Sequence, residues 1–283
     1  MIEKQSQDVG DGSLAVQVKR DLIINQGLQL AEVKELCILF LQQNFPKLRD
    51  EAIDAARKNV ESYIPVLEAS IAKHAQNIDP NKIADPDIQA SINESVQATA
   101  RKGQKANFAM LAELVSTRMK SDTSPLLSIV AEEAIRLVPR LTPTQIAYLT
   151  LCFFLNRLQF CITTIEQFEL HATCVMPIVI SGFNISDSNL RHTEYVGATS
   201  VMNMMESAYY PSLSERYPIL AGESNLHDAI SKRAPSFHIL CEQYRISKVY
   251  NVTLTSVGEL IAIMTISKAY PDGIDPKIWI NEG

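Results

Sequence analysis

The 283-residue sequence is poor in glycine and contains none of the usual glycine loops that bind phosphate groups. Only ten glycines occur, and none of them falls in a GxGxxG or GxxxxGK[ST] pattern. Such loops need glycine because their backbone approaches the phosphate too closely for a side chain. Nucleotide binding by a dinucleotide fold or a P-loop is therefore excluded.

The common metal-binding spacings are missing too. No histidines form an HxH or HExxH pattern or stand near a CxxC pair, the spacings typical of zinc sites built from neighbouring residues. A metal site would have to be assembled from residues far apart in the sequence, so we predict no metal and no cofactor. The five histidines are His74, His171, His192, His227 and His238.

Cysteine is scarce and odd in number, and most of the cysteines lie in apolar runs such as residues 151–154. Such residues behave as small buried hydrophobic side chains in a reducing compartment. The first twelve residues also lack the positive and apolar segments of a secretory signal. We therefore expect a cytoplasmic protein. The cysteines are Cys37, Cys152, Cys161, Cys174 and Cys241.

Long hydrophobic runs are absent as well. The most apolar stretch, residues 146–155, is followed by Asn156 and Arg157 and falls well short of the ~18 residues that a membrane-crossing helix needs. We interpret this stretch as a buried core helix. The alternative is an effector that disrupts membranes by exposing the 146–155 helix after activation.

The chain is acidic, with 26 basic and 32 acidic residues and a net charge of −6. Long-range electrostatics therefore give no general attraction to nucleic acid, which is not an expected partner. A local basic cluster around Gly103 is the exception. Its residues Arg101, Lys102 and Lys105 are candidate contacts for a phosphate group or a nucleic acid, although a solvated helix end explains the cluster equally well.

Helical periodicity dominates from residue 28 onward, so the predicted fold is mainly α. We expect a helical bundle over residues 28–176 and a more irregular α-helical region over 177–283 packed on it. Proline after a capping residue predicts helix starts at Ser124-Pro125 and Thr142-Pro143. Pro46 is expected to end the first helix, and Ser256 with Glu259 has the spacing of a capping box.

The N-terminal segment follows a different pattern. Residues 1–12 read as a flexible tail, and apolar and polar residues then alternate over residues 13–27, which predicts a β-hairpin arm. An isolated hairpin is only marginally stable in water, so it must dock on another subunit or on its own helical body. We favour homo-oligomerisation through the apolar face of the arm, which comprises Leu14, Val16, Val18, Leu22 and Ile24.

No catalytic residue is assigned from the sequence. His171 and Cys174 share a helical face, but no orienting carboxylate is identifiable, so a partly buried histidine beside a core cysteine is the simpler interpretation. Adjacent Glu132 and Glu133 would point about 100° apart on a helix and are interpreted as solvated charges. An enzyme whose site is scattered, for example around His171, His192 and Glu194, remains an alternative.

Several segments of the sequence resemble known groups of bacterial proteins. Residues 10–27 resemble the GDNSxxIQAGRDVxIN-type segment at the start of many uncharacterised bacterial proteins, some linked to phage defence. Gly12 stands here for the usual Asn, and Val18-Lys19 for the usual Ala-Gly. Residues 109–146 resemble the helical core of abortive-infection alpha-type proteins, with residues 252–260 similar to their closing LTxxGxxF segment and residues 192–197 adding a further likeness.

The resemblance implies a role in bacterial antiviral defence and supplies no catalytic residues. Together with the predicted arm, it suggests a non-enzymatic, homo-oligomeric sensor or effector that responds to a phage-derived or host protein trigger. A nucleic-acid-binding protein that uses the basic cluster near Lys102 is the alternative from a different functional class.

Overall fold

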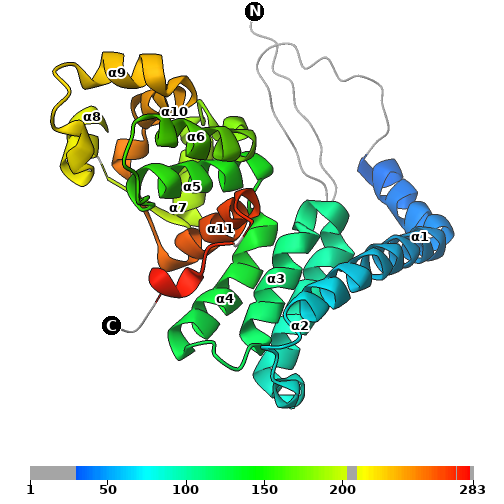
Figure 1. Cartoon of the computed structure of the whole chain (residues 1–283). Coiled ribbons are helices and arrows are strands. Elements are labelled where there is room, and N and C mark those ends of the chain that lie inside the picture. The colour runs from blue at the N-terminus through cyan, green and yellow to red at the C-terminus, as the bar shows by residue number, and fades with distance from the viewer. Residues whose placement is uncertain (1–29, 203–208, 272, 281–283) are drawn as a thin grey trace, which may run out of the picture. The chain divides into compact units, whose positions relative to one another are not determined.

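The computed structural model describes residues 30–202, 209–271 and 273–280. Helices dominate these residues (Figure 1), in agreement with the predicted mainly α class. The α-helices are α1 (Leu30–Lys73), α2 (Pro86–Lys102), α3 (Phe108–Met119), α4 (Pro125–Leu137), α5 (Pro143–Asn156), α6 (Glu166–Val179), α7 (Asp187–Tyr195), α8 (Tyr209–Arg216), α9 (Leu226–Arg233), α10 (Pro235–Ile246) and α11 (Ser256–Ile266).

Two short strands pair in the C-terminal half. β1 (Thr199–Val201) and β2 (Val252–Leu254) are antiparallel, with Ser200 opposite Thr253. About fifty residues separate the two strands, so their pairing joins the end of α7 to the start of α11. The predicted hairpin arm at residues 13–27 lies outside the described residues and stays a prediction.

The helix boundaries follow local capping chemistry. Ser124 accepts a hydrogen bond from the backbone N–H of Leu127, which confirms the predicted start of α4. Thr142 and Gln145 form a reciprocal capping box at the start of α5. Gly103 closes α2 with a positive φ of 56°, a conformation that glycine adopts at little cost.

Two sequence-based expectations about boundaries differ from the structure. The expectation that Pro46 ends a helix is wrong, because α1 continues through Pro46. An internal proline costs about 3 kcal/mol, and packing beyond it, such as that of the fully buried Tyr63, offsets this cost. The predicted division at residue 176 falls inside α6, which runs across Pro177.

The cap of α11 also differs from expectation. Thr255, and not Ser256, is the capping residue, and its hydroxyl oxygen accepts from the N–H of Gly258. Glu259 is therefore not part of a capping box. It pairs instead with Arg157 after α5, with 2.7 Å between Oε1 and Nε.

Helices α5 and α11 form the centre of the core. The two helices contact each other, and α11 also contacts α4. Every residue from 145 to 155 is buried, which confirms that the apolar stretch 146–155 is a core helix. Within the described residues, no single helix has the length and apolar composition to cross a membrane, whereas residues 166–182 and 187–195 meet both criteria only as a pair bent by 96°.

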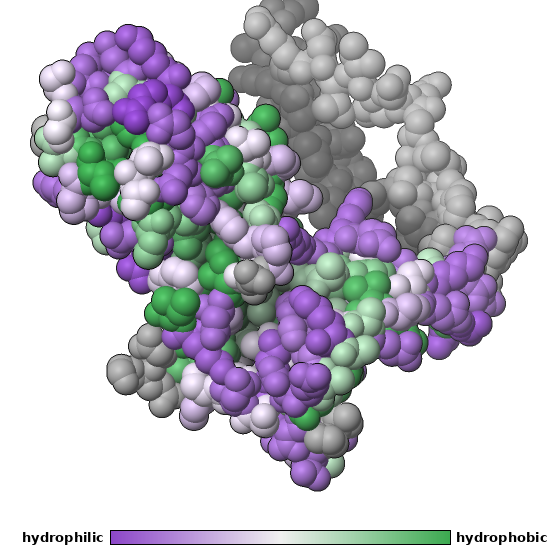
Figure 2. Space-filling view, in the orientation of Figure 1, coloured by the Kyte–Doolittle hydropathy of each residue, from purple (hydrophilic) through white to green (hydrophobic). Residues whose placement is uncertain are grey.

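Contacts divide the chain into residues 1–52 and residues 53–283. The structure describes the first part of α1 in the former unit, and the core and both pockets discussed below belong to the latter. Hydrophilic side chains mixed with small hydrophobic patches cover the visible face of α8 and α9 (Figure 2).

Arg118 on α3 is the largest side chain buried in the core, with 2% of its surface exposed. Its guanidinium pairs with Asp87 of α2 and lies 3.7 Å from a carboxylate oxygen of Glu132 on α4. It also donates to the hydroxyls of Ser91 on α2 and Ser128 on α4. A single cation thus joins three helices, which lie side by side in Figure 1.

Removing this cation should destabilise the fold strongly. We expect Arg118→Ala to lower the free energy of unfolding by about 2–5 kcal/mol, because it leaves the buried Ser91 hydroxyl without its partner and a cavity where the Arg118 side chain packed. Arg57 is exposed and pairs with the exposed Asp54 on its own helix, so Arg57→Ala should change stability by less than about 0.5 kcal/mol. Urea unfolding followed by circular dichroism measures both, and equal losses would contradict this role.

Candidate functional site

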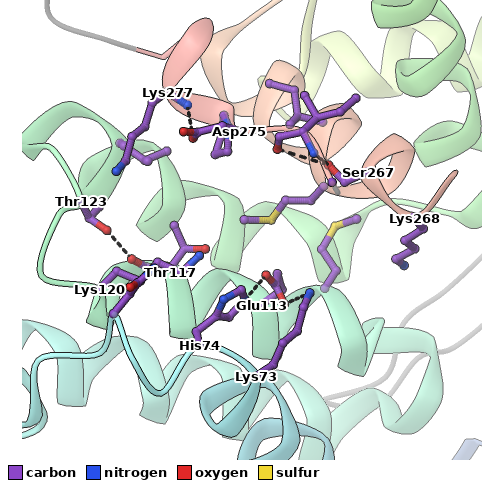
Figure 3. Close-up of a pocket in the computed structure, with 18 of the residues that line it drawn as sticks. Lys73, His74, Glu113, Thr117, Lys120, Thr123, Ser267, Lys268, Asp275 and Lys277 are labelled. Atoms are coloured by element: carbon purple, nitrogen blue, oxygen red, sulfur yellow. Dashed lines mark hydrogen bonds and ion pairs between the residues drawn. The ribbon is translucent and has the colours of Figure 1, made fainter. Parts of the chain in front are cut away.

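Two hollows in the unit formed by residues 53–283 carry charged side chains. The first, with a volume of about 540 Å³, lies between the C-terminal end of α1, helix α3 and the segment that follows α11 (Figure 3). We call it the lysine pocket. Its charged lining residues are Lys73, His74, Glu113, Lys120, Asp122, Lys268, Asp275 and Lys277.

Glu113 is the centre of the polar contacts in the lysine pocket. One carboxylate oxygen lies 2.5 Å from Nε2 of His74, and the other accepts from the hydroxyl of Ser70 at 3.2 Å. Ser116, one turn along α3, donates to Ser70 at 2.9 Å. Lys73 lies 3.7 Å from the same carboxylate (Figure 3). These contacts fasten the end of α1 to α3.

Glu113 and Lys120 are among the residues of the pocket whose pKa values are shifted. Burial alone would raise the pKa of Glu113, but the hydrogen bond from His74 and the positive charges of His74, Lys73 and Lys120 together hold the pKa below its ordinary value. Burial lowers the pKa of Lys120, and the carboxylates of Glu113 and Asp122 only partly oppose this effect.

His74 is paired with a carboxylate in the lysine pocket. Within the described residues, no serine, threonine or cysteine side chain is hydrogen-bonded to it. The positive charges are also largely matched, because Lys73 pairs with Glu113 and Lys277 pairs with Asp122. The contacts favour a structural role for this pocket.

The second hollow is a groove of about 1120 Å³ that collects cations from three segments. Arg101 and Lys102 end α2, Lys105 follows in the 3-10 turn Gly103–Ala106, and Arg140 ends the 3-10 turn Val138–Arg140. We call this the basic groove. The sequence cluster Arg101, Lys102 and Lys105 is therefore brought together in space with Arg140, a residue that sequence reasoning missed.

Among the residues that the structure describes, no carboxylate lines the basic groove beside its cations. Among the described residues, no carboxylate forms an ion pair with Arg101, Lys105 or Arg140, whereas Lys102 donates to the carbonyl oxygen of Pro139 at 2.5 Å. The N-terminus of α5 also borders the groove at Thr142, and its dipole adds further positive potential.

One wall of the basic groove is apolar. Side chains from α1, α3, α5 and α6 contribute to it, so a ligand would meet hydrophobic surface next to the cations. The larger apolar lining residues are Val66, Phe108, Leu141, Ile146 and Ile178.

A signal for Arg140 was present in the sequence. It stands two residues before Thr142-Pro143, so a basic residue precedes a well-marked helix N-terminus, a combination that suits an anion. By contrast, nothing in the sequence linked His74 with Glu113, which are 39 residues apart.

The other predicted site residues occupy separate structural positions. His171 stacks on Phe160 with ring centres 3.7 Å apart, and burial lowers the pKa of His171. Cys174 is exposed, so the interpretation of a core cysteine beside this histidine is wrong. His192 contacts the side chain of Gln145, and Glu194 accepts from the N–H of Val201.

Two further expectations are corrected. Glu132 is not a solvated charge, because it pairs with Arg136 at 2.5 Å and approaches the buried Arg118. The cysteines are not uniformly buried. As free thiols, Cys152 and Cys241 lie in the core, and Cys161 and Cys174 are exposed. The apolar face of the predicted arm lies outside the described residues.

The comparisons with known proteins identify a family and no activity. A model of an uncharacterised protein family matches residues 27–225. Neither the curated proteins nor the solved structures contain a match to this chain.

The depressed pKa of Glu113 predicts how stability depends on pH. Its ionised form is favoured in the folded protein, so it contributes stability that is present above its ordinary pKa of 4.5 and lost as the pH falls through its lower folded pKa. Glu113→Gln should lower the free energy of unfolding at pH 7 by about 1–3 kcal/mol and weaken its dependence on pH below 4.5.

Denaturant unfolding at pH 7 and at several values below 4.5 tests this. Glu68→Gln, on the exposed side of α1, is the matched control and should leave both quantities unchanged. If Glu113→Gln retains the stability of the wild type at pH 7, the contacts of Glu113 do not stabilise the packing of α1 against α3.

Proposed function

We propose that this chain, which belongs to the uncharacterised family whose model matches residues 27–225, is a non-enzymatic sensor or effector of bacterial antiviral defence that binds a phosphate-bearing ligand in its basic groove and acts as a homo-oligomer. The defence context rests on the sequence resemblance. The ligand chemistry rests on the groove.

The observation that carries the ligand proposal is the meeting of Arg101, Lys102, Lys105 and Arg140 in one groove with no acidic residue among the described lining. The chain as a whole is acidic, so a groove with four basic side chains is a local reversal of charge. Phosphate is the anion that suits several converging arginine and lysine side chains, since it accepts many hydrogen bonds at once.

The apolar wall narrows the class of ligand. A ligand that fills the groove would place its phosphate near the cations and a less polar portion, such as a nucleobase, near Leu141 and Ile146. Small-molecule sites commonly combine a mainly apolar lining with a few placed polar groups. We therefore propose a small phosphate-bearing molecule of nucleotide type.

A sensor fits the chemistry better than an enzyme does. His74, His171 and His192 are each engaged in contacts that join or pack helices. The alternative of a membrane-disrupting effector is less favoured, because exposing residues 146–155 would remove a central helix from the core.

Charge reversal in the basic groove should weaken ligand binding. We expect the double variant Lys105→Glu and Arg140→Glu to lower the affinity for ATP at least about tenfold, which corresponds to ~1.4 kcal/mol. Isothermal titration calorimetry at low and moderate salt measures this, with tighter binding expected at low salt. Lys102 is left intact because it holds Pro139.

The matched control reverses two exposed cations on α1, as Arg57→Glu and Lys58→Glu. This variant changes the net charge equally and should bind ATP as the wild type does. Equal weakening in both variants, or no binding of ATP and pyrophosphate by the wild type, would contradict the ligand proposal. Affinity that rises steadily with the length of a DNA or RNA strand would favour the nucleic-acid-binding alternative instead.

Assembly is proposed to depend on the N-terminal arm, whose apolar face comprises Leu14, Val16, Val18, Leu22 and Ile24. Light scattering of the full chain should give a multiple of 31.5 kDa, and a chain that lacks residues 1–27 should give a smaller oligomer or a monomer. Identical oligomeric states for the two chains at matched concentrations would rule out assembly through the arm.

A further inference from the structure

Helices α9 and α10 bring together three side chains that the sequence keeps apart. His238 and Glu242 lie one turn apart on α10, and His227 lies on the preceding helix α9. One potential ligand atom from each of these residues lies within 4.8 Å of the others. We propose that His227, His238 and Glu242 bind a divalent transition-metal ion, with Zn²⁺ as the preferred ion. This site is separate from the basic groove.

The donor set suits zinc. Imidazole nitrogen and carboxylate oxygen bind Zn²⁺ at about 2.0–2.2 Å, so the ligands of a tetrahedral site are roughly 3.4 Å apart. Nε2 of His227 already lies 4.0 Å from Oε1 of Glu242. The His227 side chain is 52% exposed, so a small rotation brings its nitrogen into range at little cost.

The second nitrogen of each histidine also has a partner. Nδ1 of His238 lies 2.7 Å from the hydroxyl oxygen of Tyr210, and Nδ1 of His227 lies 3.4 Å from a carboxylate oxygen of Asp228. When Nδ1 carries the proton and donates to these oxygens, Nε2 keeps the lone pair that a metal needs. Partners of this kind orient metal-binding histidines and fix their tautomer.

The surroundings hold the cluster in place. The ring of Tyr210 packs against both histidines, with ring centres 5.3 Å from His227 and 6.4 Å from His238. The rings of His227 and His238 meet edge to face at 4.8 Å. Three protein ligands leave one position of a tetrahedral ion for water or for an outside ligand. The geometry therefore resembles an open metal site more than a closed structural one.

The test is direct titration of the full chain with Zn²⁺ after treatment with a chelator. We expect one ion per chain with a dissociation constant of about 10 μM or tighter. His227→Ala, His238→Ala and Glu242→Gln should each weaken binding at least about tenfold. Far-UV circular dichroism shows whether each variant is folded. Because the His227 side chain is exposed, His227→Ala should disturb the core least.

Matched controls replace residues of the same types outside the cluster. His192→Gln on α7 and the exposed Glu215→Gln on α8 should bind Zn²⁺ as the wild type does. Tyr210→Phe removes the contact to Nδ1 of His238, so it should weaken binding by about 10–100-fold as a positioning residue does. Addition of Zn²⁺ should also raise the melting temperature of the wild type and not that of His238→Ala.

Cobalt gives an independent readout of the coordination sphere. Co²⁺ in a four-coordinate site of nitrogen and oxygen ligands should produce visible absorption that Zn²⁺ displaces and that His227→Ala abolishes. Three results would overturn the proposal: no Zn²⁺ binding by the wild type, binding that persists in the His227→Ala and His238→Ala double variant, or a preference for Mg²⁺ over Zn²⁺.

Discussion

The buried guanidinium of Arg118 on α3 requires oxygen atoms around it, and the two neighbouring helices α2 and α4 supply them. A permanent positive charge is costly to bury unless carboxylates and hydroxyls surround it. Asp87 and Ser91 come from α2, and Ser128 and Glu132 come from α4. Because Arg118 itself belongs to α3, the relative positions of three helices are set by the geometry of one cation. A hydrophobic residue at this place would fill the volume without specifying those positions.

The basic groove depends on the same alignment. Beyond Arg118, Arg136 of α4 binds Glu94 of α2 at 2.9 Å, and Lys102 at the end of α2 donates to Pro139 after α4. The contacts of Arg118, Arg136 and Lys102 follow one another along α2 and α4, so they hold the ends of these two helices together. Arg101 and Lys105 are thereby held near Arg140. A polar network that stabilises the bundle thus also concentrates positive charge at one end of it.

The candidate sites differ in how many of their residues could be predicted from the sequence. Arg101, Lys102 and Lys105 are close neighbours in the chain, so their cluster was visible at once. His238 and Glu242 have the i, i+4 spacing of one helical face, but His227 joins them only because α9 packs on α10. His74 and Glu113 depend on the packing of α1 against α3. A site whose members come from different helices leaves no fixed spacing in the sequence.

The sequence by itself determined the features that depend on contacts within about one helical turn. The caps at Ser124 and Thr142, the end of α2 at Gly103 and the burial of residues 146–155 are of this kind, because capping and periodicity act over three or four residues. Only the tertiary structure decided that α1 continues through Pro46, that β1 pairs with β2 and that Glu259 binds Arg157. These outcomes depend on which distant segments pack together, and burial energy gained there outweighs the local preferences that the sequence displays.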